Sequence, residues 1–284
     1  MKANMKNKTT KERIIEEYYK KMGEYGILTD SNWINEQKDF YERILPDKLL
    51  YKYIAFDDDA NLNAKKIQCL QEEKLWYAAH YTLLDKTEFQ IQANIYKVAR
   101  LTNTSVKYVH DILETLRELC DVCCLTDSLR EQMWQEYANN HNGICCIFSI
   151  LDYKNLSPVI YCKKDRADFT NEVIRAIKNP NMNADVKVIS TIPFVLKDKQ
   201  SYGFEQEIRL LSQDIYDSED DELGGRIDVG KKKEIGYKGT YYSYEYSGLK
   251  LDKIILGRNL NDTIKEMIQQ MEFSLEEEWD NLYY

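Results

Sequence analysis

The chain has 284 residues and a formal net charge of -9, with 43% hydrophobic and 12% aromatic residues. A chain of this length and hydrophobic content can bury a substantial core, which excludes general disorder. The acidic balance makes general nucleic-acid binding an unfavourable prediction, because neutralising phosphates requires a basic face.

The sequence predicts a cytoplasmic protein with no membrane partner. No apolar run approaches the length needed to span a bilayer, and residues 1–21 lack the apolar core of a signal peptide. Seven cysteines, an odd number with adjacent pairs at Cys123–Cys124 and Cys145–Cys146, do not form the pattern of a disulfide framework. A reducing compartment is therefore expected.

Hydrophobic spacing predicts two N-terminal helices, over 9–22 and about 33–45. The elements expected next are a strand at 49–56, a helix at 60–73, a strand at 74–81, helices at 86–101 and 105–120, a strand at 121–126, a helix at 127–140 and a strand at 143–150. Ser105 is placed to cap one of these helices, and Asp127 or Ser128 to cap another.

The second half of the chain continues this mixture. The expected elements are a strand at 157–162, helices at 166–178 and about 184–197, a strand or helix at 203–212, an acidic surface loop at 218–225, strands at 236–246 and 250–257, and a helix at 261–271. No internal repeat or linker divides the chain. The prediction is one α+β domain over 47–284, with a mixed or antiparallel central sheet flanked by helices, and an N-terminal helical arm over 1–46.

The stretch from Met133 to Phe148 carries the first candidate for chemistry. On a helix, Trp134, Tyr137 and His141 share one face, and Gly143 allows the left-handed turn that ends the helix. An aromatic face beside a polar helix end suits a flat ligand, whose rings stack while polar groups fix its orientation. The competing interpretation is that the two aromatic residues belong to the core.

A second polar cluster comes late in the chain, at Glu205, Glu207 and Arg209. On a strand all three side chains would project from one face, whereas on a helix Glu205 and Arg209 would pair at i and i+4. A surface salt bridge is one interpretation. The other is a carboxylate that a guanidinium keeps ionised and oriented in a pocket.

Scattered blocks of the sequence resemble a bacterial family known as domain of unknown function 2971. Its "MW-x-x-YA-x-x-H-x-G" block is matched by Met133, Trp134, Tyr137, Ala138, His141 and Gly143. Weaker blocks are matched by Leu50 to Tyr53, by Asp85 and Glu88, by Lys197, Glu205, Glu207 and Arg209, and by the strand ending at Gly257. The family's Asn and Pro near Asp85 are absent here, and the N-terminal arm lies outside the resemblance.

Several members of this family look distantly similar to ADP-ribosyltransferases, which implies NAD as a substrate. That similarity implies that Tyr51, Lys52 and Tyr53 contact the dinucleotide, with Lys52 at the pyrophosphate. It implies that Trp134 or Tyr137, beside His141, stacks on nicotinamide. It also implies that Glu207 is the catalytic carboxylate, with Glu205 beside it and Arg209 orienting both. The family context implies a defence or toxin effector. The N-terminal helices are a candidate contact surface for another protein of such a system.

Two other functions stay open. The same pocket could recognise a nucleotide-type small molecule without converting it, as a sensing or partner-binding module. A metal-dependent nuclease could use Asp85, Glu205 and Glu207, but it would need a lysine beside the acids, and the position two beyond Glu207 is Arg209.

A zinc site is set aside. Its ligands would be Cys120, Cys123, Cys145, Cys146 and His141, but no second Cys-x-x-Cys exists and the cysteines lie in apolar strand patterns. No metal is therefore expected.

Overall fold

A computed structural model describes residues 9–22, 31–83, 88–162, 168–179, 188–212 and 236–277. Its first half contains α1 (Thr10–Met22), α2 (Ser31–Ile44), β1 (Leu49–Ala55), α3 (Ala60–Gln71), β2 (Lys74–Ala79), the 3-10 turn η2 (His80–Thr82), α4 (Ile95–Thr102), α5 (Val106–Glu118), β3 (Asp121–Thr126), α6 (Glu131–Tyr137) and β4 (Gly143–Ile150). Its second half contains β5 (Leu156–Pro158), β6 (Ile160–Cys162), α7 (Thr170–Lys178), the 3-10 turn η4 (Ile192–Val195), β7 (Leu196–Asp198), α9 (Lys199–Tyr202), β8 (Glu207–Ser212), β9 (Gly239–Ser243), β10 (Leu249–Leu256), α10 (Asp262–Gln269) and β11 (Leu275–Glu277).

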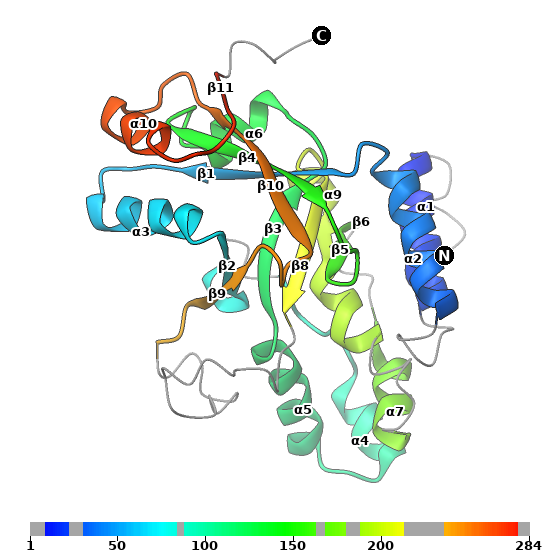
Figure 1. Cartoon of the computed structure of the whole chain (residues 1–284). Helices are drawn as coiled ribbons and strands as arrows, with labels where there is room; N and C mark the ends of the chain where they lie inside the picture. Colours follow the sequence, from blue (N-terminus) through cyan, green and yellow to red (C-terminus); the bar gives the residue numbers. More distant parts are fainter. Residues whose placement is uncertain are drawn as a thin grey trace.

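The central sheet is mixed and is flanked by helices, as the sequence predicts for an α+β domain (Figure 1). Within the described ranges its strand order is β11-β10-β4-β1-β3-β2-β9, with β8 and β5 branching from β3. The parallel pair β10–β11 makes it mixed, because the other strand pairs of this sheet among the described residues are antiparallel. A small second sheet pairs β6 with β7 in parallel.

Strand β3 is the junction of the sheet. One of its edges pairs with β8 along its full length, from Asp121 to Thr126. Its other edge is shared, because β2 pairs at Asp121 and Val122 while β1 pairs at Thr126. The sheet therefore splits between β1 and β2, and the split lies opposite the strand that carries Glu207 and Arg209.

The two N-terminal helices pack on the sheet as a hairpin, at the right of Figure 1. Their buried side chains belong to the same hydrophobic cluster as sheet residues such as Leu50 and Ile208. Two tyrosines anchor the helices further, since the Tyr19 hydroxyl donates to Pro158 O at 2.8 Å and the Tyr41 hydroxyl donates to Leu156 O. Both acceptors lie on β5, beside β8.

Helices α4, α5 and α7 form a lobe at the foot of Figure 1, around a second hydrophobic cluster that includes Phe89 and Phe194. Ser105 caps α5 as predicted, with its side chain accepting from Tyr108 N at 3.0 Å. The described part of the chain contains no helix with the length and hydropathy needed to cross a membrane.

Several predicted elements differ from the structure. The helix predicted at 86–101 begins only at Ile95, because Asn94 accepts from Lys97 N and caps it there. The helix predicted at 127–140 is shortened to α6, whose N-cap is Arg130 rather than Asp127 or Ser128. The strand predicted at 157–162 is divided into β5 and β6.

A further difference lies in the helix predicted at about 184–197. Within the described residues 188–197, the helix ends at Thr191 and is followed by η4 and by strand β7, which carries Lys197. The sequence allows a strand or a helix at 203–212, and the structure has a strand there, β8. The acidic stretch 218–225 lies outside the described residues.

Candidate functional site

The polar residues of β8 lie at the centre of a buried charge cluster. Arg209 Nε donates to Glu207 Oε1 at 2.7 Å, and Lys197 Nζ donates to Glu207 Oε2 at 2.8 Å. Lys197 also donates to Glu205 Oε2 at 2.5 Å, and Arg209 Nη2 to Glu88 Oε2 at 2.5 Å. We call these five residues the acid cluster. All five side chains are buried, so their charges depend on one another rather than on water.

The carboxylates of the acid cluster outnumber its cations, and the excess falls on Glu205. Burial, together with the negative charge of Glu207, raises the pKa of Glu205 to about 7. Burial would also raise the pKa of Glu207, but Arg209 and Lys197 hold it well below its ordinary value. Near neutral pH the cluster therefore combines a carboxylate that stays ionised with one that exchanges its proton.

Glu205 and Glu207 do not lie on one continuous strand. Between them, Gln206 has a left-handed backbone with a φ of 45°, and β8 begins only at Glu207. The predicted projection from one face of a strand therefore holds for Glu207 and Arg209, which lie two residues apart on β8 and form an ion pair. Glu205 reaches Lys197 from the turn before the strand, with its main-chain oxygen accepting from Thr126 Oγ1 at 2.5 Å.

Several aromatic residues contact the acid cluster, namely Tyr161, Tyr202 and Phe89, and also Tyr137, which bonds the Glu205 carboxylate. The Tyr137 hydroxyl donates to Glu205 Oε1, so the C-terminal end of α6 and the turn before β8 converge in space. The Tyr137 side chain is 36% exposed, in contrast to 3% for Glu205. Burial and the bond to Glu205 raise the pKa of Tyr137 well above its ordinary value, which keeps this hydroxyl a donor.

Trp134 and His141 do not face this site. Trp134 is fully buried, edge-on to Tyr53 at 5.1 Å between ring centroids and stacked on His141 at 5.8 Å. His141 Nε2 lies 3.1 Å from Glu131 Oε1 and 2.7 Å from Arg258 Nη2. The core interpretation therefore describes Trp134, whereas His141 is a buried residue whose ring nitrogen lies against Glu131 and Arg258.

The residues after α6 adopt the left-handed conformation that the sequence assigned to Gly143. Asn139, Asn140 and His141 have φ values of 46°, 51° and 67°. Gly143 instead begins β4, where an added Cβ would lie 2.5 Å from Ile54 O and 2.9 Å from Ala138 Cβ. The assignment of the turn to Gly143 was wrong, and close strand packing is what requires glycine there.

The β1 residues Tyr51, Lys52 and Tyr53 make contacts within the sheet and with the residue before α6. Lys52 Nζ donates to Cys124 O at 2.9 Å, on the edge of β3 that lies between the pairings with β2 and β1. The Lys52 ammonium thus bonds a β3 main-chain oxygen at the point where neither β1 nor β2 pairs with β3. Tyr51 is half-buried in register with Thr126, and the Tyr53 hydroxyl accepts from Arg130 N at 3.2 Å.

The cysteines with described side chains are free thiols. Cys120, Cys123, Cys145 and Cys146 are buried, and burial raises the pKa of Cys146 to about 12. Within the described ranges no group of three or more His, Cys, Asp or Glu side chains is arranged to hold a metal ion. Asp85 lies outside those ranges.

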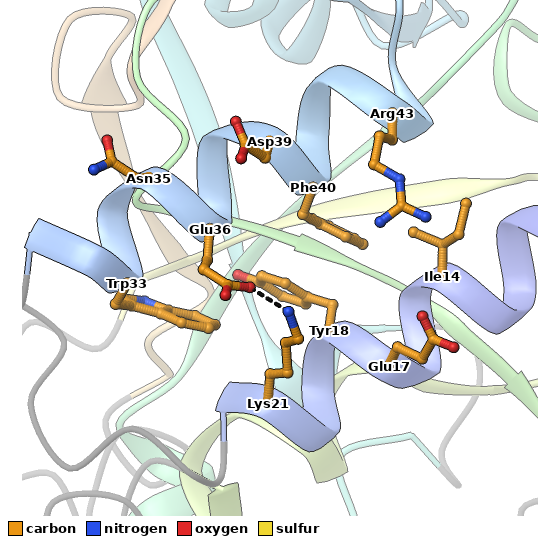
Figure 2. Close-up of a pocket in the computed structure, with 10 residues that line it drawn as sticks. All are labelled: Ile14, Glu17, Tyr18, Lys21, Trp33, Asn35, Glu36, Asp39, Phe40 and Arg43. Carbon is orange, nitrogen blue, oxygen red and sulfur yellow. Dashed lines mark hydrogen bonds and ion pairs between the residues drawn. The ribbon is translucent and has the colours of Figure 1, made fainter.

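A separate cavity of about 550 Å³ lies between α1 and α2 (Figure 2). The Tyr18 ring stacks on Trp33 at 5.2 Å and on Phe40 at 3.9 Å, and Lys21 pairs with Glu36 at 2.6 Å. None of the acid-cluster residues lines this cavity. It is a feature of the N-terminal helices.

Two members of the acid cluster, Lys197 and Glu88, were missed as site residues. Lys197 is held on β7, and its Nζ lies 3.6 Å from Glu88 Oε1. The signal that could have found them is their presence in the blocks that carry the family resemblance. Their sequence separation from Glu207 gave no reason to place them together.

Comparison with known proteins identified no matching family model, no matching curated protein and no matching solved structure.

Proposed function

We propose that this protein is an ADP-ribosyltransferase-like enzyme that acts on NAD or a related nucleotide, with Glu205 and Glu207 as its reacting carboxylates. The observation that carries the proposal is that one lysine, Lys197, bridges two buried carboxylates whose pKa values are driven in opposite directions. Such pairs of titratable groups identify acid and base assignments in enzymes.

The two carboxylates would divide the chemistry. Nicotinamide leaves with the electron pair of its bond to ribose, and positive charge develops on the sugar, where a fixed anion stabilises it. Glu207, held ionised by Arg209 and Lys197, supplies that fixed charge. Glu205, with a pKa near neutrality, accepts the proton that the incoming water or acceptor hydroxyl loses as it bonds to the sugar.

The positions of the two carboxylates favour Glu205, rather than Glu207, as the one that contacts the substrate. Both Glu207 oxygens are bonded to buried cations, whereas one oxygen of Glu205 is bonded to the partly exposed Tyr137. Glu205 would therefore meet the substrate, and Glu207 with Arg209 would set the charge behind it.

The proposed biological setting is a bacterial defence or toxin effector, and it rests on the family resemblance. The N-terminal helices would contact a partner protein of such a system. Their cavity, with aromatic side chains between charged ones, supports a contact surface on that side of the molecule (Figure 2).

A second candidate is a sensing module that binds a nucleotide without converting it. The observation in its favour is that Glu207 and Arg209 are already bonded to protein partners, as in a structural ion-pair network. A metal-dependent nuclease is less well supported. Lys197 supplies the lysine that the sequence lacked beside the acids, but its ammonium lies among the three carboxylates where a cation would bind.

The proposal is tested by measuring nicotinamide release from NAD by the purified protein and its toxicity on expression. Glu205→Gln and Glu207→Gln should each lower the rate by about 100-fold or more, as loss of an electrostatic catalyst does. Glu114→Gln, on the surface of α5, is the matched control and should retain the rate. Full activity in both site variants would contradict the assignment. NAD binding without release would favour the sensing module.

A further inference from the structure

The groups bonded to Glu205 differ in their access to solvent. Lys197 and Thr126 are buried, and they hold one carboxylate oxygen and the main-chain oxygen. Tyr137 holds the other carboxylate oxygen, and its side chain is more than one third exposed. The ring of Tyr137 therefore connects a buried carboxylate to the surface.

The backbone that follows Tyr137 is held by burial and by several hydrogen bonds, which favours a movement of the side chain alone. The neighbouring Ala138 is fully buried, and Asn139 Nδ2 donates to Phe56 O at 2.7 Å. His141 N donates to Trp134 O, and His141 O accepts from Asn259 N, each at 3.2 Å. A run of left-handed residues persists only when its surroundings determine it in this way.

The position of the Tyr137 hydroxyl also selects the chemistry of a ligand that would replace it. A ligand anion there would meet Glu205 and Glu207, and a ligand cation would compete with the buried ammonium of Lys197. A neutral hydroxyl reproduces the bond that Tyr137 makes, because it donates to the same carboxylate oxygen.

We propose that Tyr137 is a side-chain gate over Glu205, and that a ligand displaces it by placing a neutral sugar-type hydroxyl on Glu205 Oε1. The gate rests on the proposed function only for the identity of that ligand, which would be the ribose of NAD. Rotation of the Tyr137 side chain exchanges one hydrogen bond for an equivalent one, so opening needs no rearrangement of the acid cluster.

The gate is tested without reference to enzymatic activity, by treating the protein with a water-soluble carbodiimide and glycine methyl ester at pH 6. Attachment at Glu205, to glycine methyl ester or to Lys197, is quantified by peptide mass spectrometry. In Tyr137→Phe and Tyr137→Ala, Glu205 should react about two- to tenfold faster, the factor that one hydrogen bond to a largely protonated carboxyl group represents at this pH. Tyr108→Phe, an exposed tyrosine of α5, is the control and should leave the rate unchanged.

An unchanged rate of Glu205 modification in both Tyr137 variants would overturn the gate. NAD and free ribose are then added to Tyr137→Phe. Protection of Glu205 by either supports the hydroxyl assignment. Faster modification with no protection by NAD or ribose would overturn the hydroxyl assignment and contradict the NAD proposal, while leaving the gate supported.

Discussion

Replacing Lys197 by methionine tests whether the acid cluster is a mutually dependent network. Lys197 Nζ lies 2.5 Å from Glu205, 2.8 Å from Glu207 and 3.6 Å from Glu88. At an effective dielectric constant near 20, one ion pair at 4 Å is worth about 4 kcal/mol before desolvation is subtracted. Removing one partner of a buried pair leaves a net loss of about 3–5 kcal/mol, and we expect a loss in that range at pH 7.

The deficit of Lys197→Met should shrink in acid. Without the ammonium, the folded pKa of Glu205 rises further above the unfolded value of 4.5. The folded pKa of Glu207, which Lys197 helps to hold below 4.5, rises toward that value. A carboxyl group whose folded pKa is raised stabilises the fold at low pH and loses that contribution as the pH increases. Urea unfolding at pH 5 and pH 7, followed by tryptophan fluorescence, should therefore give the smaller loss at pH 5.

Lys199→Met, two residues further on, is the matched control. Lys199 is half-exposed and pairs with Glu12 at 2.5 Å, so its removal should cost less than about 1 kcal/mol. Equal losses in the two variants, or a loss below about 1 kcal/mol for Lys197→Met at pH 7, would refute the interdependence of the buried charges.

Three further predictions concern stability. Because the folded pKa of Glu205 is raised from 4.5 to about 7, its stabilising contribution is lost as the pH rises through that window. The free energy of unfolding of Glu205→Gln, measured by urea titration, should therefore increase relative to that of wild type by up to about 3 kcal/mol between pH 5 and pH 8. Trp134→Ala should cost about 3–5 kcal/mol, because the ring is fully buried; a loss under about 1 kcal/mol would show that the ring is not a core element. Gly143→Ala should cost about 1–3 kcal/mol through its contacts with Ile54 O and Ala138, and an unchanged thermal midpoint would contradict the close packing.

Most of the local structure follows from short-range patterns in the sequence. Hydrophobic spacing placed α1, α2 and α5, and strand patterns placed β1, β3 and β4, because the periods of helix and strand are local properties of the chain. The Ser105 cap and the shared face of Glu207 and Arg209 follow from the same short-range geometry.

The contacts between polar residues that lie far apart in the sequence depend on how the whole chain packs. Glu88, Lys197 and Arg209 converge because β8 pairs with β3 while β7 and the segment before α4 pass beside it, and no local pattern encodes those long-range contacts. The same packing buried Trp134 and His141, which occupied one face of a predicted helix, and left Tyr137 to reach Glu205. Periodicity states which side of an element is apolar, but which charges share a site depends on strand register and on the path of the whole chain.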